Sequence, residues 1–279
     1  MNMRGARSRR RALAGLLLAL AAGVANAAPQ RIASLNLCAD SLLLELVEPA
    51  RLVSLTKLAR DPNLSNFAAE ASRIPANHGL AEEILPLHPD LVLTTTDSAS
   101  AAPALLARLG LEVMTLETPT DFAGWRRTLR TLAQRLGAEA RAAALIAEFD
   151  ARLARLAPAA TPRRAIVYQA NGYVPGPSTF ADDMLRGAGL VDAYAVAGHP
   201  EGGFLPLEHL ITLAPDVLVV SNAYAEHPAL ANTLLDHPAL AGRRAPGRPG
   251  FRYVAIPERL WTCGSSRLAE AVERLAAAR

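Results

Sequence analysis

The sequence predicts an α/β protein of two lobes joined by a long helical segment, and three observations lead to this fold class. Short apolar runs of strand type alternate with helical patterns along most of the chain, which is typical of parallel sheets covered by helices. A twelve-residue segment that starts at Glu82 recurs in similar form at Glu208, with an offset of 126 throughout. Between the two copies, residues 121–157 have helical periodicity and no strand. We therefore expect two Rossmann-like lobes joined by a single long backbone helix, with a ligand cleft between the lobes.

Residues 1–27 are expected to be a cleaved export signal rather than part of the fold. Five arginines precede an apolar run from Ala12 to Val24, and the small residues 25–27 follow as a cleavage site. This apolar run is shorter than the roughly 20 residues that a membrane-spanning helix needs. The arginine cluster leaves open whether export follows the general secretory or the twin-arginine route.

The composition excludes several classes of protein. A chain with 51% hydrophobic residues is too apolar to be disordered, and two cysteines are too few for a disulfide framework or a cysteine-rich zinc domain. The net charge of +3 comes from the export signal, because its removal leaves 24 basic residues against 26 acidic ones. We therefore expect no nucleic-acid partner.

The first lobe is predicted over residues 28–120. Its opening strand leads to Asn36, a suitable N-cap for the helix that follows. The expected strands of this lobe are 31–35, 52–55, 91–95 and 113–116, and its expected helices are 38–47 and 104–109. In both copies of the repeated segment a short amphipathic helix stops at a Pro-Asp turn and a buried strand follows, which favours duplicated lobes.

The backbone helix is predicted over residues 121–160. Asp121 is its expected N-cap, Gly137 interrupts its apolar stripe, and Pro158 ends it. The second lobe, residues 161–279, resumes the α/β pattern. Its expected strands are 165–168, 217–221 and 252–256, and a helix is expected near 180–187.

Several segments together resemble the periplasmic substrate-binding proteins of ABC importers, in the cobalamin and iron-siderophore branch. The resemblance covers nearly the whole chain from Gln30 and is carried by residues 31–36, 58–62, 85–93, 180–190 and 237–240. It implies a monomeric periplasmic receptor that captures a metal-chelate ligand between its lobes and delivers it to an ABC permease in the inner membrane. The chain departs from this pattern at residues 261–266, where many relatives have a Gly-Pro turn.

Enzyme motifs are missing from the sequence, which contains no G-x-S-x-G, H-E-x-x-H, C-x-x-C or phosphate-loop pattern. We therefore expect a binding protein and not an enzyme, with an exported α/β enzyme as the alternative from a different class.

Residues after strands and before helices are expected to face the cleft. The ligand-binding candidates chosen in this way are Asn36, Cys38, Arg60, Asp61, His78, Tyr168, Tyr173, Phe204, Tyr224 and Trp261. Core packing is the alternative interpretation for Tyr168 and Phe204. The second-lobe candidates are aromatic and uncharged, which suits a large, flat ligand: a corrinoid first, haem or a ferric siderophore second, and a free divalent metal third. We expect no resident cofactor and no metal site, because three or four converging ligands are not evident.

Cys38 and Cys263 admit three interpretations. A disulfide is the usual state of two cysteines in an exported protein. The alternatives are a pair of thiolates that ligate a metal and two unrelated buried thiols. The resemblance also implies acidic residues on the lobe rims that orient the permease, and Glu70 is the candidate on the first lobe.

Overall fold

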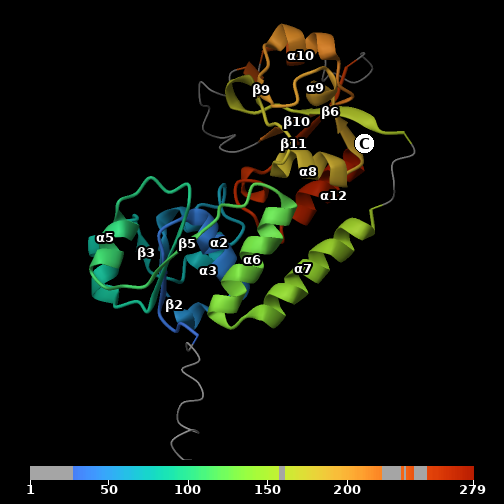
Figure 1. Ribbon diagram of the computed structural model, residues 1–279. Helices are drawn as coiled ribbons and strands as arrows, with labels where there is room; N and C mark the ends of the chain where they lie inside the picture. Colours follow the sequence, from blue (N-terminus) through green and yellow to red (C-terminus); the bar gives the residue numbers. More distant parts are fainter. Residues whose placement is uncertain (1–27, 157–160, 222–233, 236, 242–249) are drawn as a thin grey trace, which may run out of the picture.

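The computed structural model describes residues 28–156, 161–221, 234–235, 237–241 and 250–279. These residues form two lobes that are joined along one side by helices (Figure 1). Both lobes combine parallel sheets with helices, which confirms the predicted α/β class. The predicted export signal lies outside the described residues. Within the described part of the chain, no helix has the length and apolar character to cross a bilayer.

The first lobe is built around a five-stranded parallel sheet with the strand order β3-β2-β1-β4-β5. Every residue of β1 and β4 is buried, which explains why these strands contain apolar and small hydroxyl side chains and no charged ones. The short β3 at the sheet edge was not predicted. The strands are β1 (Ile32–Ser34), β2 (Leu52–Thr56), β3 (Ala76–Asn77), β4 (Leu91–Thr95) and β5 (Val113–Leu116).

Helix α2 (Leu37–Leu46) follows β1 and begins at the predicted cap. The Asn36 side-chain oxygen accepts hydrogen bonds from the backbone N–H groups of Cys38 at 2.8 Å and Ala39 at 3.4 Å. The shorter helical elements of this lobe are η1 (Pro49–Arg51), η2 (Lys57–Arg60), α3 (Ala68–Ala71), α4 (Ala81–Ile84), η3 (Leu85–Leu87) and α5 (Ala102–Arg108).

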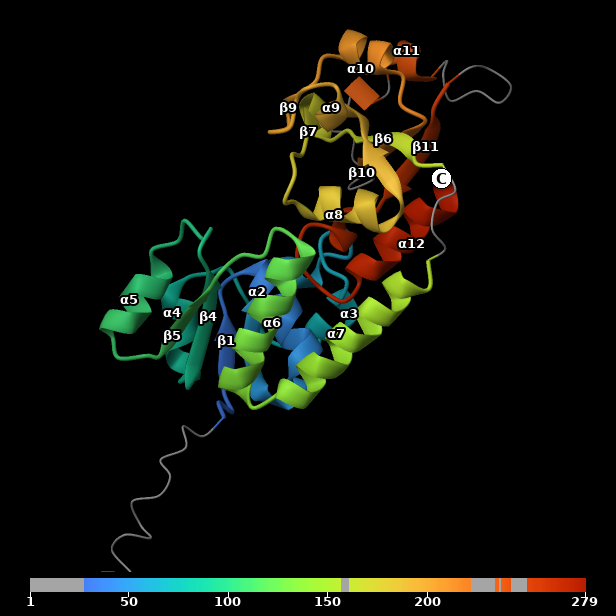
Figure 2. The same ribbon diagram turned by 45° about the vertical axis from the view of Figure 1, so that its right-hand side comes forward.

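The segment predicted as one helix over residues 121–160 consists of two helices, of which the second joins the lobes. Helix α6 (Phe122–Leu136) ends at Gly137, whose φ of 67° lies in the left-handed region. The Gly137 N–H bonds the carbonyl of Ala133, which closes the helix end. The chain then turns back into α7 (Glu139–Ala154), and Figures 1 and 2 show the two helices forming a V.

Helix α7 connects the lobes. Its end reaches α12 (Leu268–Ala278), the last helix of the chain (Figure 2). Arg152 of α7 forms a two-pronged ion pair with Glu273 of α12, with N–O distances of 2.8 and 2.7 Å. This ion pair therefore links α7 directly to the last helix of the second lobe.

The second lobe contains a four-stranded parallel sheet with the strand order β11-β10-β6-β8 and a small antiparallel ribbon of β7 and β9. The strands are β6 (Arg163–Val167), β7 (Tyr173–Val174), β8 (Leu190–Asp192), β9 (Gly203–Phe204), β10 (Val217–Ser221) and β11 (Arg252–Ile256). The other helical elements are η4 (Ala170–Gly172), α8 (Phe180–Gly187), α9 (Ala193–Val196), α10 (Leu207–Leu213), α11 (Pro238–Ala241) and η6 (Glu258–Leu260).

The repeated sequence segment has the same structure in both lobes. His88 and Ala214, 126 residues apart, have left-handed φ values of 45° and 46° at the end of a short helix. Asp90 and Asp216 each accept a hydrogen bond from a backbone N–H at the start of the adjacent strand, at 3.0 and 2.8 Å. β4 and β10 therefore begin with the same local structure in the two lobes, as the sequence repeat predicts.

A continuous apolar core extends from the first lobe through α6 and α7 into the second. Phe149 of α7 packs against the rings of Phe122 at 5.0 Å and Trp125 at 4.9 Å, and Phe122 also faces Phe180 of α8 at 6.4 Å. Val272 of α12 belongs to the same cluster. Because a shared core resists separation, the lobes are coupled rather than independent.

Candidate ligand cleft

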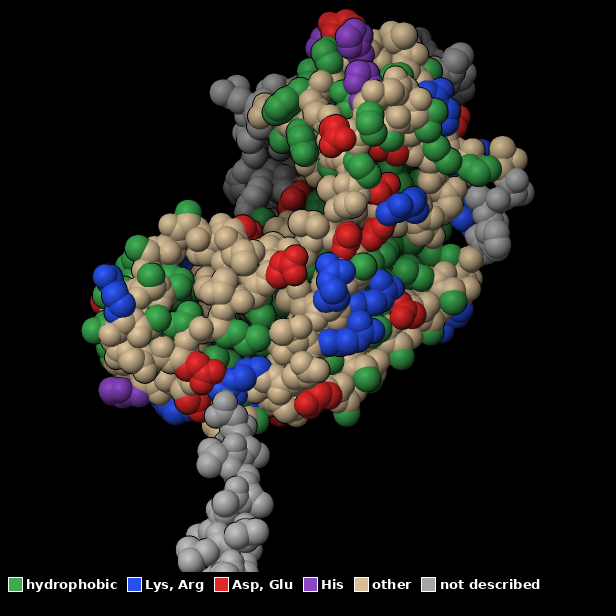
Figure 3. All heavy atoms as spheres, in the orientation of Figure 1, with side chains coloured by type: hydrophobic (Ala, Val, Ile, Leu, Met, Phe, Trp, Pro, Cys, Tyr) green, Lys and Arg blue, Asp and Glu red, His purple; other side chains and the backbone are tan. Residues whose placement is uncertain are grey.

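A cleft of about 300 Å³ lies between the lobes. Figure 3 shows the surface notched between them. The first wall is formed by residues 118–120, between β5 and α6, and the second wall comes from the second lobe. The second-lobe residues are Gln169, Tyr173, Pro175, Thr179, Phe180, Ala181, Glu258, Trp261 and Thr262.

Aromatic rings form much of the second wall. The pairing of β7 with β9 sets Tyr173 opposite Phe204, and their rings meet edge to face at 5.6 Å. Tyr173 is 39% exposed and lines the cleft, whereas Phe204, 71% exposed, is not among the described residues that line it. Trp261 lines the cleft although only 7% of its surface is exposed. Its indole N–H is buried without a hydrogen-bond partner among the described residues.

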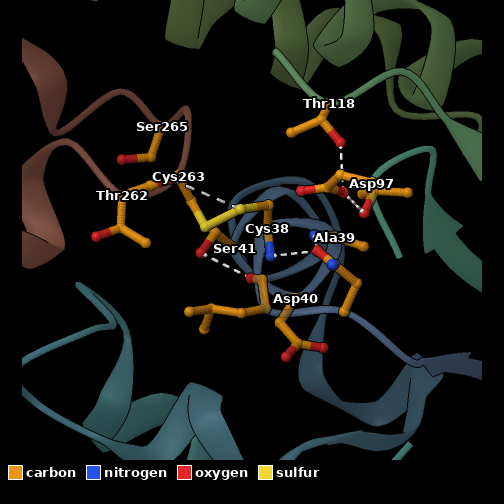
Figure 4. Close-up of a disulfide and its surroundings, with 12 residues drawn as sticks. Cys38, Ala39, Asp40, Ser41, Asp97, Thr118, Thr262, Cys263 and Ser265 are labelled. Atoms are coloured by element: carbon orange, nitrogen blue, oxygen red, sulfur yellow. Dashed lines mark hydrogen bonds between the residues drawn. A yellow bond between two sulfur atoms is a disulfide. The ribbon is translucent and has the colours of Figure 1, made fainter. Parts of the chain in front are cut away.

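The charges at the cleft are acidic. Glu258 accepts hydrogen bonds from Ser221 and from Thr262 Oγ1, the latter at 3.2 Å. Asp97, just after β4, accepts from Thr118 Oγ1 at 2.6 Å (Figure 4). That hydrogen bond and one from Thr95 hold the Asp97 pKa below its usual value. No lysine or arginine is among the described residues that line this cleft.

Cys38 and Cys263 form a disulfide beside the cleft, with a Cα–Cα distance of 5.0 Å (Figure 4). The structure thus agrees with the first of the three interpretations. Cys38 belongs to the first turn of α2 in the first lobe, and Cys263 precedes α12 in the second. The bond therefore crosses from one lobe to the other and directly follows the cleft residue Thr262.

His78 lies in the loop after β3, at the carboxyl edge of the first sheet, with 60% of its side chain exposed. Its Nδ1 is 2.8 Å from Glu83 Oε1, and its backbone N–H donates to Glu83 Oε2 at 2.6 Å. Hydrogen bonding to the His78 side chain lowers the Glu83 pKa. The structure gives His78 Nε2 no partner among the described residues, so a carboxylate orients the ring and leaves one nitrogen available. His78 is not among the described residues that line the cleft.

Other predicted site residues have local structural contacts. Asn36 caps α2, Arg60 donates to the carbonyl of Ile74 at 2.5 Å, and Asp61 accepts from the N–H of Asn63 at 2.8 Å. All three follow strands at the carboxyl edge of the first sheet, yet they are not among the residues that line the cleft.

Tyr168 belongs to the core and not to the cleft, which corrects its place among the ligand candidates. It is fully buried, and its hydroxyl donates to the carbonyl of Leu205 at 2.9 Å. Burial raises the pKa of Tyr168 to about 12. Tyr224 lies outside the described residues, and Glu70 is exposed on α3.

The structure adds cleft residues that the sequence analysis missed. Gln169 and Glu258 each stand two residues after a strand, β6 and β11. The position after a parallel strand was therefore the signal that identifies them. Thr118 and Thr120 lie where the first lobe passes into α6, and no motif marks them.

A larger cavity of about 450 Å³ lies wholly within the second lobe, beside α10. It is lined by His199, which stacks on Tyr194 at 4.4 Å, and by His209 and Phe204. Among the described residues, no group of three or more metal-ligating side chains converges here or elsewhere. The cavity does not reach the first lobe, so the smaller cleft is the one that both lobes build.

Comparisons with known proteins agree with this architecture. A family model described as periplasmic binding protein matches residues 32–246. The periplasmic heme-binding protein RhuT from Roseiflexus sp. RS-1 is similar in structure, with 24% identity, a TM-score of 0.69, and coverage of 89% of this chain and 98% of that one. Among curated proteins, no sequence matches this chain.

Two structures from Vibrio cholerae are also similar, each at 18% identity. The periplasmic heme-binding protein HutB has a TM-score of 0.72, with coverage of 89% of this chain and 98% of that one. The periplasmic vitamin B12 binding protein BtuF has a TM-score of 0.59, with coverage of 89% and 96%. At these identities the likeness establishes the fold.

Proposed function

The chain belongs to the periplasmic binding protein family, and from this premise we propose that it captures a metal tetrapyrrole, a corrinoid in the first place, in the periplasm. The family and the fold are those of substrate-binding proteins that supply ABC permeases and not those of enzymes. The mechanism is therefore binding and delivery. Because the lobes share one core, affinity comes from a cleft that is largely formed before the ligand arrives.

The observation that carries the corrinoid proposal is the chemistry of the cleft. Its described lining combines aromatic rings with the uncharged groups of Gln169, Thr118 and Thr262, and its charged member is the carboxylate of Glu258. A corrinoid presents a flat macrocycle surrounded by amide side chains, which exchange hydrogen bonds with such groups. The anionic oxygens of a catecholate siderophore would meet Glu258 without a compensating cation from the described lining.

Haem is the second candidate, because His78 has the arrangement of an axial ligand. Metal-binding histidines commonly donate their other ring nitrogen to a carboxylate, which fixes the ring and raises its basicity, and Glu83 occupies that position. A histidine is a common axial ligand of haem iron. Two of the similar solved structures described above are heme-binding proteins, which supports the same candidate.

The test is calorimetric titration of the mature protein with cyanocobalamin, haemin and a ferric catecholate siderophore. We expect one cyanocobalamin per chain, bound at least about tenfold more tightly than haemin, and no binding of the siderophore. Tyr173→Ala is expected to weaken cyanocobalamin binding about tenfold, since it removes an aromatic contact. Leu109→Ala, an exposed position at the end of α5, is the matched control that leaves binding unchanged.

Haemin binding tighter than that of cyanocobalamin would refute the corrinoid proposal. His78→Ala then decides the role of that residue. If His78 ligates haem iron, the variant shifts the Soret band of the haemin complex and leaves cyanocobalamin titrations unaffected. Failure of both tetrapyrroles to bind would reject the ligand class altogether.

A further inference from the structure

Residues 259–266 connect the end of the second sheet to α12, and they carry the cleft residues Trp261 and Thr262. By sequence this segment belongs to the second lobe. The disulfide attaches Cys263, in its middle, to Cys38 of the first lobe. We call residues 259–266 the strap.

Glu45 provides a second attachment from the first lobe. This glutamate of α2 is only 5% exposed. Its Oε1 accepts two hydrogen bonds from Ser266, one from the backbone N–H at 2.9 Å and one from Oγ at 2.5 Å. A buried carboxylate is costly unless hydrogen bonds compensate, so Glu45 and the end of the strap depend on each other.

Asn66 supplies a third attachment from another part of the first lobe. Its side-chain Nδ2 donates to the carbonyl of Arg259 at 2.6 Å and to Ser265 Oγ at 3.4 Å. Asn66 lies between η2 and α3, whereas Glu45 and Cys38 lie on α2. The first lobe thus contacts the beginning, the middle and the end of the strap.

Gly264 shows how tightly the strap is packed. A Cβ atom at this position would lie 3.0 Å from side-chain atoms of Phe180, Pro119 and Trp125. These residues come from α8, the cleft wall and α6, so the strap fills the junction where both lobes and the linking helix meet. A side chain there would require these neighbours to shift by a few tenths of an ångström.

From these contacts we propose that the strap is mechanically part of the first lobe and that Glu45 is the positioning residue that holds it, so that Trp261 and Thr262 keep a fixed place on the cleft. The importance of that place rests on the proposed function, but the attachment itself does not. The disulfide favours the contacts that hold Cys263 beside Cys38. By thermodynamic reciprocity, those contacts favour formation of the disulfide by the same factor. Loss of Glu45 therefore makes the disulfide easier to reduce.

The first experiment measures the thiol–disulfide equilibrium of the ligand-free mature protein against dithiothreitol, which is oxidised to its cyclic disulfide as Cys38 and Cys263 become thiols. Glu45→Ala is expected to favour reduction about tenfold, equivalent to about 30 mV. Glu45→Gln retains an acceptor oxygen and should stay within about threefold of the wild type. Glu48→Ala, an exposed acid just after the same helix, is the matched control.

Hydrogen exchange of the strap amides provides the second readout. The N–H groups of Trp261 and Ser266 should exchange faster in Glu45→Ala than in Glu48→Ala, in the oxidised protein without ligand. Ser266→Ala, which removes one donor and leaves the carboxylate, gives a milder shift in the same direction and serves if Glu45→Ala does not fold. Equal redox equilibria and equal exchange for the position 45 and 48 variants would overturn the proposal.

Titration with cyanocobalamin and haemin separates this proposal from the proposed function. If the redox and exchange effects occur and neither tetrapyrrole binds to the wild type, the strap assignment stands and the ligand assignment fails. If cyanocobalamin binds and Glu45→Ala leaves both ligand-free readouts unchanged, the ligand assignment stands and the strap assignment fails.

Discussion

Asp40 gives the protein a pH-dependent stability that one substitution should remove. The side chain is completely buried on α2, where its carboxylate accepts from the Thr56 N–H at 3.2 and 3.3 Å and from Thr56 Oγ1 at 2.5 Å. These hydrogen bonds favour the charged form, but burial outweighs them and raises the pKa of Asp40 to about 7 from an ordinary 3.8.

The direction of the effect follows from proton binding. Between the unfolded pKa near 3.8 and the folded pKa near 7, the folded protein binds one more proton at Asp40 than the unfolded chain does. The free energy of unfolding therefore falls as the pH rises through this window, by about 1.4 kcal/mol per unit. The Asp40 contribution is fully present below pH 3.8 and is lost by pH 7, a total of about 4 kcal/mol.

Asp40→Asn keeps a side-chain acceptor for Thr56 and cannot ionise. Urea unfolding followed by circular dichroism at pH 4, 5.5, 7 and 8 should show that the variant gains about 4 kcal/mol relative to the wild type between pH 4 and 7, with no further change above. Glu48→Gln, at an exposed position, should track the wild type. Parallel pH profiles for the wild type and Asp40→Asn would refute this reasoning.

Three further predictions concern the cleft wall, the disulfide and the rim. Trp261→Phe removes a buried N–H that has no partner among the described residues, and this gain offsets part of the packing that the smaller ring loses. Ligand-free stability in urea should therefore fall by less than about 2 kcal/mol, and a larger loss would contradict this. Replacing both Cys38 and Cys263 by serine removes a covalent link between residues 225 positions apart. The free energy of unfolding in urea should fall by about 5 kcal/mol. A variant as stable as the oxidised wild type would contradict this. If Glu70 docks the permease, Glu70→Lys should lower uptake into permease-containing vesicles several-fold and leave ligand affinity unchanged. Glu148→Lys, at an exposed position on α7, is the control. Equal uptake with both variants would refute the docking role.

Two of the strands that the sequence predicted, β4 and β10, are mostly apolar because they are buried. β4 and β10 are buried over nearly their whole length and follow a Pro-Asp turn. The apolar pattern and the preceding turn therefore both indicate a strand at the same place. β3, β7 and β9 have two residues each, too few for any periodicity. Gly137 was visible as an interruption, but the direction of the chain after a left-handed residue depends on tertiary packing.

The site was predictable on the side of the second lobe and less so on the first. Tyr173 and Trp261 line the cleft as expected, Tyr173 at the start of β7 and Trp261 at the end of η6. Tyr168 follows a strand and is buried, since its hydroxyl finds a carbonyl inside the lobe. The sequence alone does not distinguish the buried Tyr168 from the cleft residue Tyr173, because both are aromatic residues shortly after a strand-like run.

The paired aspartates Asp90 and Asp216 provide a comparison within one molecule. Each accepts a hydrogen bond from a backbone N–H at the same place in its lobe, but Asp90 also accepts one from the Gln30 N–H at 2.7 Å, and the lobes differ in sheet size. Asparagine at one site and then at the other removes the same charge from two settings under identical solvent and temperature. The difference between the two results measures how much of a local contact's worth is set by the lobe around it.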